Sequence, residues 1–61
     1  MKAIELDSQI VTQYSTTEIQ SILEGVEGVL DVSVIAATQQ LFVYCDDEYA
    51  DVGKLNALFD V

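Results

Sequence analysis

The sequence has very few side chains that bind metals or act as general bases. It contains no histidine and a single cysteine, Cys45, in 61 residues. One cysteine excludes an internal disulfide framework, and one cysteine without histidine provides too few soft ligands for a structural zinc site within one chain. Histidine is the side chain that titrates closest to neutral pH, so an obvious general base is missing as well. We therefore expect a protein that is not an enzyme, with no catalytic residues, no metal site and no cofactor.

Basic residues are nearly as scarce. Lys2 and Lys54 stand against eleven acidic residues, which gives a net charge of −9 at pH 7. Such a charge repels the phosphates of nucleic acids and the anionic surfaces of membranes. The charge has two readings, a soluble acidic surface or an electrostatic match to a basic protein. The expected partner is therefore a protein, and a basic one where the charge is used.

Long apolar runs are also missing. No run approaches the roughly 20 residues that a membrane-spanning helix needs, and the first residues, MKAIELDSQ, lack the pattern of a signal peptide. The chain contains neither a glycine-rich phosphate loop nor a G-x-S-x-G motif. We expect one domain, residues 1–61, with a cytoplasmic location. A chain of this size buries only about 60% of its unfolded surface, which leaves no room for a deep cleft.

The strongest pattern that is present runs from Gly25 to Asp47. Branched apolar residues fill 29–36 and 41–45, and a short polar connection, Thr38-Gln39-Gln40, separates the two runs, which predicts a β-hairpin. Alternation assigns the side chains to two faces. The predicted core face carries Leu30, Val32, Val34, Leu41, Val43 and Cys45, and the opposite face carries Asp31, Ser33, Ile35, Phe42 and Tyr44. This second face is more apolar than a solvated face requires.

The remaining segments predict one further strand and two helices. Residues 2–7 alternate as a short strand with Ile4 and Leu6 buried, and residues 8–14 read as a polar connection. A capping box, Ser15-Thr16-Thr17-Glu18, starts a helix that Gly28 ends in a left-handed conformation. Asp51 caps a last helix over residues 52–60. The predicted apolar stripes are Ile19, Ile22, Leu23 and Val26 on the first helix, and Val52, Leu55, Leu58 and Phe59 on the second.

The order β-α-β-β-α resembles the heavy-metal-associated domains of copper chaperones and metal-pumping ATPases. The similarity lies in Gly28-Val29-Leu30-Asp31-Val32-Ser33-Val34, in Ala37-Thr38 and in Phe42-Val43-Tyr44-Cys45-Asp46, and it covers about residues 10 to 60. It implies an α+β, ferredoxin-like fold, a two-layer sandwich with helices on one face of an antiparallel sheet.

Three features depart from this family. Its metal-binding C-x-x-C motif falls on Thr12 and Ser15, whose hydroxyls are not soft anionic ligands for Cu(I) or Zn(II). Ile4 and Leu6 lie one position out of phase with the family's first strand. The chain ends at Val61, so we expect the final strand of βαββαβ to be missing, which leaves the first strand as an open edge. A partner strand or a second copy of the chain then becomes a candidate to cover it.

Two candidate binding surfaces follow. The first is the apolar part of the second sheet face, Ile35, Phe42 and Tyr44, which is exposed if the helices cover only one side. The second is the acidic turn, Asp46, Asp47 and Glu48. Together with Asp51 these carboxylates lack the spacing of a dedicated calcium loop, and a solvated turn with a helix cap explains them better. Cys45 falls on the core face in an acidic neighbourhood, where a thiolate is disfavoured.

These features favour a small acidic, non-catalytic protein-binding module. One concrete form is an inhibitor that imitates nucleic acid and docks on a basic partner. Two alternatives stay open. The first is metal handling of the heavy-metal-associated type, through Cys45 or a cysteine shared across a dimer. The second is a structural domain of a larger assembly.

Overall fold

The computed structural model describes residues 1–59 and contains three strands and three α-helices. The elements are β1 (Lys2–Glu5), α1 (Ser8–Gln13), α2 (Thr16–Glu24), β2 (Val29–Ile35), the 3-10 turn η1 (Ala36–Thr38), β3 (Gln40–Cys45), the 3-10 turn η2 (Asp47–Tyr49) and α3 (Val52–Ala57). The predicted α+β class and the three predicted strands are confirmed. The predicted helix end at Asp60 and the terminal Val61 lie outside the described residues.

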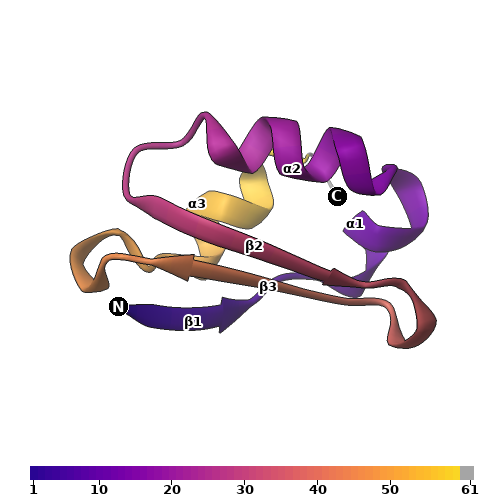
Figure 1. The fold of residues 1–61 in the computed structure, drawn as a ribbon, viewed down its shortest axis with the longest axis horizontal. Helices are drawn as coiled ribbons and strands as arrows, with labels where there is room; N and C mark the ends of the chain where they lie inside the picture. Colours follow the sequence, from indigo (N-terminus) through magenta and orange to yellow (C-terminus); the bar gives the residue numbers. More distant parts are fainter. Residues whose placement is uncertain (60–61) are drawn as a thin grey trace.

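The three strands form one antiparallel sheet in the order β1-β3-β2, with β3 in the middle (Figure 1). The predicted hairpin is the pair β2 and β3. β1 is shorter than predicted, but the backbone N–H of Leu6 still donates to the carbonyl of Leu41 at 2.9 Å, after which Asp7 begins the next element. Ile4 and Leu6 are buried as expected.

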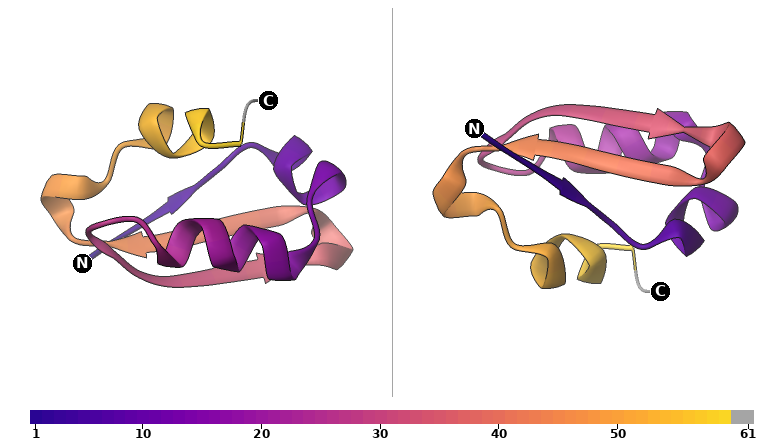
Figure 2. Two further views of the ribbon diagram at one scale, coloured as in Figure 1. Left: turned by 90° about the horizontal axis from the view of Figure 1, so that it is seen from above. Right: turned by 90° about the horizontal axis from the view of Figure 1, so that it is seen from below.

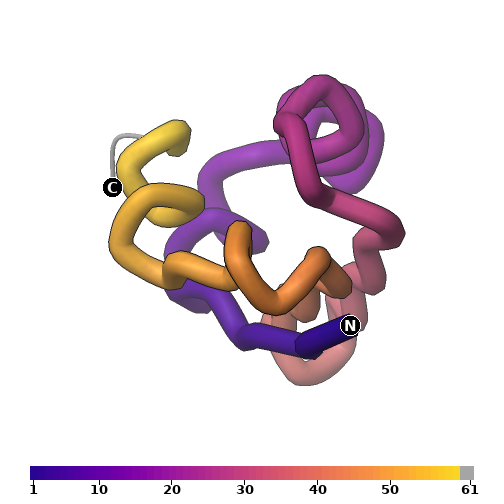
Figure 3. The backbone as a smooth tube through the Cα atoms, turned by 90° about the vertical axis from the view of Figure 1, so that its left-hand side faces the viewer, coloured from indigo at the N-terminus to yellow at the C-terminus, as the bar shows by residue number. Residues whose placement is uncertain are grey.

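The helices lie on one side of this sheet. Seen end-on, α2 and α3 sit next to each other above the strands (Figure 3). Seen from below, the strands lie in front of α2, and no helix of residues 1–59 covers them (Figure 2). We call this uncovered side the open sheet face. By strand alternation and register it carries Ala3, Glu5, Asp31, Ser33, Ile35, Phe42 and Tyr44.

The core lies between the sheet and the helices and is entirely apolar. Its buried members are Ile4, Leu6, Ile10, Ile19, Leu23, Leu41, Val43, Cys45, Leu55 and Phe59. All three predicted core residues of β3 are among them, each fully buried. The strict alternation of β3 therefore gives this strand one buried face and one face turned toward the open side.

The prediction that residues 8–14 form a polar connection is wrong, because residues 8–13 form the helix α1. Asp7 caps this helix by accepting from the backbone N–H of Gln9 at 2.9 Å. Ile10 is fully buried in the core, and this contact stabilises a helix too short to persist alone. Tyr14 follows α1, donates from its hydroxyl to the carbonyl of Phe59 at 2.6 Å, and packs edge-on against the Phe59 ring.

The capping box at the start of α2 is confirmed. The Ser15 hydroxyl accepts from the backbone N–H of Glu18, and the Glu18 carboxylate accepts from the backbone N–H of Ser15. Both bonds satisfy N–H groups that the first turn would otherwise leave unpaired. The bond from the Ser15 backbone N–H to the carboxylate is the main cause that lowers the pKa of Glu18, and the Ser15 side chain adds to it. The predicted end of α2 at Gly28 is wrong: α2 ends at Glu24, although Gly28 does take a left-handed conformation with φ of 88°.

Two predicted apolar stripes are narrower than expected. The predicted last helix is shorter than expected, since α3 ends at Ala57 and a turn follows. Of its predicted stripe, Leu55 and Phe59 are buried, but Val52 and Leu58 are 42% and 47% exposed. At 3.6 residues per turn, Val52 and Leu58 lie about 60° to either side of Leu55, so the small core reaches only the centre of the stripe. On α2, Ile19 and Leu23 are buried in the same way, whereas Ile22 is 36% exposed.

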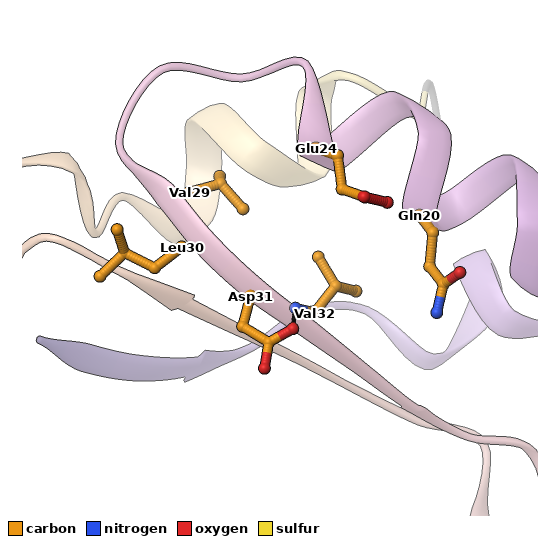
Figure 4. Close-up of a pocket in the computed structure, with 6 residues that line it drawn as sticks. All are labelled: Gln20, Glu24, Val29, Leu30, Asp31 and Val32. Atoms are coloured by element: carbon orange, nitrogen blue, oxygen red, sulfur yellow. Dashed lines mark hydrogen bonds between the residues drawn. The ribbon is translucent and has the colours of Figure 1, made fainter.

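The predicted core position of Leu30 is also wrong. The register shifts between Val29 and Asp31, which pair with Cys45 and Tyr44, so Leu30 is the extra residue of a β-bulge. In Figure 4, Val29 and Val32 point toward the helix side of β2, whereas Leu30 and Asp31 point away from it. The side chains of Leu30 and Asp31 therefore both point away from the core, although they are consecutive, and Leu30 is 55% exposed.

Candidate protein-binding surface

The centre of the open sheet face is a pair of aromatic side chains on β3. Phe42 and Tyr44 are two residues apart on one strand and therefore share a face. Both are half-buried, since the neighbouring strands cover their sides while the face above them is uncovered. The structure therefore places these two predicted site residues next to each other, with part of each ring surface accessible.

Each aromatic residue has a carboxylate directly opposite it on a neighbouring strand. Phe42 pairs with Glu5 of β1, and Tyr44 pairs with Asp31 of β2. Directly opposite residues of a regular antiparallel ladder, such as Glu5 and Phe42, have Cβ atoms about 4.5–5.5 Å apart, close enough for their side chains to interact. Asp31 and Tyr44 are paired next to the bulge at Leu30. The open sheet face thus combines aromatic surface with negative charge within single cross-strand pairs.

Sequence reasoning missed the pairing of Glu5 with this surface. Alternation already places Asp31 on the second face, but Glu5 lies in a separate strand whose register with β3 no local pattern reveals. The signal that was available is the strict alternation of Ala3, Ile4 and Glu5 around a buried Ile4. It orients the Glu5 side chain without saying which residue lies opposite.

Ile35 lies at the other end of the sheet face. It is 40% exposed and pairs with Gln40, two residues before Phe42 on β3. This places Ile35 diagonally beside Phe42 rather than beside Tyr44. Leu30, which sequence reasoning assigned to the core, adds a second exposed apolar side chain next to Asp31.

The outer edge of β2 is protected against strand pairing near its start. The Asp31 carboxylate accepts from the backbone N–H of Val32 at 2.8 Å, next to the bulge at Leu30. A polar recess opens between this edge and α2, with Gln20 and Glu24 of the helix above Val29 and Val32 (Figure 4). Bulges and edge charges of this kind discourage the addition of another strand.

The predicted acidic turn follows Tyr44 after one buried residue. Asp46, Asp47 and Glu48 are all exposed, and η2 orders the turn by the bond from the N–H of Tyr49 to the carbonyl of Asp46. The amino terminus lies 3.3 Å from the Asp47 carboxylate, with both groups exposed. Exposed pairs of this kind contribute little to stability. The turn therefore extends the negative charge of the open sheet face beyond its Tyr44 end.

A second, smaller recess lies on the helix side, between the end of α2 and α3. Val26, Tyr49, Leu55 and Leu58 provide its apolar lining, and Glu27, Glu48 and Asp51 lie among its polar residues with Lys54. The Tyr49 hydroxyl donates to the Glu27 carboxylate at 3.4 Å. Lys54 thus gives this recess a basic residue of the chain itself, in contrast to the open sheet face.

The side chains considered for metal binding are not arranged as a site. Cys45 is fully buried, and burial, with a smaller effect of the Asp46 charge, raises the pKa of its thiol. Thr12 donates to the carbonyl of Gln9 and Ser15 caps α2, so both hydroxyls serve the backbone. Within residues 1–59, no three His, Cys, Asp or Glu side chains come close enough to hold a metal ion together.

No family model, curated protein or solved structure matches this chain. None of the helices in the described part of the chain is long and apolar enough to cross a membrane.

Proposed function

We propose that this protein is a non-catalytic binding module that docks the open sheet face, with the adjoining acidic turn, onto a basic protein. The observation that carries the proposal is the pairing of accessible aromatic rings with carboxylates in the register of the sheet. Aromatic residues are enriched at the centres of protein interfaces, where they contribute large apolar contact area. The net charge of −9 then favours a partner of opposite sign and speeds the encounter.

The same charge argues against nucleic acid as the partner. Aromatic residues on an open sheet also stack on the bases of single-stranded RNA, but such sheets need basic residues for the phosphates. Here the aromatic pair is flanked by Glu5 and Asp31. An inhibitor that imitates nucleic acid, and so occupies the basic surface of a nucleic-acid-handling protein, is the concrete form that we favour.

We further propose that the described residues form three strands of a ferredoxin-like fold, as the resemblance to heavy-metal-associated domains implies. The order β1-β3-β2 with all strands antiparallel supports this assignment, as do α2 and α3 on one side. β1 is then the edge beside which the fourth strand of that fold would lie. A partner strand, or β1 of a second copy, is the corresponding candidate for this edge.

Metal handling and a structural role in a larger assembly are the two alternatives. Metal handling requires Cys45 to leave the core or to be shared between copies, so a Cys45→Ser protein with unaltered metal content removes this hypothesis. A structural role requires a neighbour that completes the sheet. Light scattering that gives the monomer mass at micromolar concentration argues against completion by a second copy.

The experiment that tests the leading proposal is affinity capture from a lysate of the source cells at low salt, read by mass spectrometry. The test variant is Phe42→Ala with Tyr44→Ala, which keeps the net charge and therefore controls for nonspecific adsorption of basic proteins. Val52→Ala with Leu58→Ala is the matched control, since it removes two exposed apolar side chains from the helix side. Circular dichroism shows that each variant is folded.

We expect one stoichiometric partner that the control retains and the test variant loses. If all three proteins capture the same diffuse set of basic proteins, the proposal is wrong. If instead the α3 variant loses the partner, binding belongs to the recess on the helix side and not to the open sheet face.

A further inference from the structure

The two acid–aromatic pairs of the open sheet face are suited to one particular cation. In Glu5–Phe42 and Asp31–Tyr44, the carboxylate and the ring come from directly opposite positions of adjacent strands. A cation above either ring is attracted by its π face and can pair with the carboxylate beside it. Each pair therefore offers two kinds of contact to a single positively charged group.

Arginine fits this combination better than lysine does. The guanidinium group is planar, so it stacks on an aromatic face while its N–H groups donate to a carboxylate in a bidentate geometry. It is also more weakly hydrated than an ammonium group, so less hydration is lost on contact with a ring. A lysine can contact the ring or the carboxylate as a point charge, but it cannot make the planar stack.

Neither carboxylate has a competing cation in the described part of the chain. The only ion pair there joins the amino terminus to Asp47, and the Glu5 carboxylate makes no hydrogen bond within residues 1–59. One oxygen of Asp31 accepts from the N–H of Val32 at the outer edge of β2, and its second oxygen makes no hydrogen bond within residues 1–59. The Glu5 carboxylate and the second oxygen of Asp31 are therefore open to a cation from outside.

The spacing of the pairs restricts the partner further. Phe42 and Tyr44 are alternate residues of β3, about 6.6–6.8 Å apart along the strand, and alternate residues of any extended segment have the same spacing. The carboxylates lie on opposite sides of β3, toward β1 for Phe42 and toward β2 for Tyr44. We propose that the open sheet face binds an extended segment with arginine at alternate positions, one guanidinium group on each acid–aromatic pair.

This inference rests on the proposed function, because it specifies the chemistry of the partner that docks on the same face. Its test uses two probes of equal charge, the peptides acetyl-Gly-Arg-Gly-Arg-Gly-amide and acetyl-Gly-Lys-Gly-Lys-Gly-amide. Each is titrated into the 15N-labelled protein at low salt and followed by amide chemical shifts. We expect the arginine peptide to bind about fivefold tighter, with the largest shifts on β3 and on the residues opposite Phe42 and Tyr44.

The matched variants each remove two negative charges. In Glu5→Gln with Asp31→Asn, the amide oxygen at position 31 still accepts from Val32. In Asp47→Asn with Glu48→Gln, the same change of net charge falls on the acidic turn. The first variant should weaken the arginine peptide about tenfold and the second less than twofold, because only the first removes carboxylates beside the rings.

Equal binding of the two peptides, or equal losses in the two variants, overturns the arginine inference. If the peptides bind equally well and Phe42→Ala with Tyr44→Ala abolishes both, the proposed function stands and only the preference for arginine fails. If neither peptide shifts the open sheet face, the arginine inference fails, and the capture experiment with Phe42→Ala and Tyr44→Ala decides the proposed function separately. Light scattering completes the test, since a dimer whose interface is this face also overturns the inference.

Discussion

At the scale of single residues, the surroundings of a side chain decide what it can do. Cys45 is the only thiol, yet it lies among apolar core residues with no accessible surface. Tyr14 and Tyr44 are both half-buried, but Tyr14 donates to a backbone carbonyl in the interior and Tyr44 lies on the open sheet face. Residue type alone does not separate these roles.

Burial of Cys45 predicts a loss of stability at alkaline pH. The unfolded thiol ionises near the ordinary pKa of 9.0, whereas the folded thiol has a raised pKa, so between the two values the unfolded state binds fewer protons. The contribution of the neutral thiol to the free energy of unfolding is therefore fully present below pH 9. It is lost as the pH rises through the raised pKa of the folded thiol. Urea titrations between pH 7 and pH 10.5 measure this decline.

Cys45→Ala is the control for the alkaline decline, because it lacks the titrating thiol while the tyrosines and lysines remain. Its free energy of unfolding should fall less steeply above pH 9 than that of the natural protein. Parallel curves would show that the thiol of Cys45 does not contribute.

The exposure of Leu30 predicts a contrast between two leucines. Leu30→Ala should change the free energy of unfolding by less than about 0.5 kcal/mol, because its side chain lies outside the core. Leu23→Ala should cost about 2–5 kcal/mol, because it leaves a cavity among fully buried residues. Thermal melts followed by circular dichroism measure both. A large cost at Leu30 would place it in the core and contradict the bulge.

At the scale of elements, short segments hold their conformation through contacts with other segments. α1 and α3 have six residues each, too few to persist alone in water. Two hydrogen bonds connect α1 with the α3 region. The N–H of Asp7, before α1, donates to the Asn56 side chain at 3.0 Å, and the hydroxyl of Tyr14, after α1, donates to the carbonyl of Phe59. The acidic turn is held similarly, by η2 and by the packing of Tyr49 over Gly28.

The connection from α2 to β2 depends on glycine at one position and not at another. A Cβ atom on Gly28 would lie 2.3 Å from Cγ of Tyr49, and the residue has φ of 88°. Gly28→Ala should therefore cost about 1–3 kcal/mol from backbone strain alone, in addition to displacing the Tyr49 ring. Chemical denaturation measures the cost.

Gly25→Ala is the matched control for Gly28→Ala. Gly25 is in the right-handed helical region, and a Cβ atom there would meet nothing closer than 3.7 Å. This variant should be neutral or more stable by about 0.4–1 kcal/mol, because alanine restricts the unfolded chain. Equal destabilisation by the two variants would contradict the assigned backbone conformations.

At the scale of the whole molecule, charge is the dominant property. Eleven acidic residues and two lysines belong to a chain whose described part has a radius of gyration of 10.3 Å. Separations between carboxylates are therefore comparable to the Debye length at 0.1 M salt, about 10 Å, and their repulsion is only partly screened. Their mutual repulsion destabilises the compact state. The same negative charge opposes self-association and favours association with positively charged molecules.

This repulsion predicts that salt stabilises the protein. Raising the NaCl concentration from 0.01 M to 0.2 M should raise Tm by several degrees, because screening weakens repulsion among carboxylates and only one exposed ion pair is present in the described residues to be weakened. KCl and choline chloride should act equally if screening is the cause. A fall in Tm with salt would show that attractive pairs outweigh the repulsion.

The sequence by itself determined those features that depend on near neighbours in the chain. The capping box of α2, the hairpin, the alternation of β3 and the Asp51 cap each depend on residues within a few positions of one another, and all are present. The net charge and the small number of metal-binding side chains follow from the composition alone. Phe42 and Tyr44 could be assigned to the second sheet face for the same reason.

Only the tertiary structure decided the features that depend on distant contacts. α1 forms because Ile10 enters a core made by other elements, and the bulge turns Leu30 outward because Val29 takes the place opposite Cys45. The carboxylate opposite Phe42 comes from β1, 37 positions away in the chain, since Glu5 and Phe42 meet only through sheet register. Register follows from the hydrophobic pattern and from turn geometry, and no tight turn links β1 to β3, so their register depends on how both strands pack in the core.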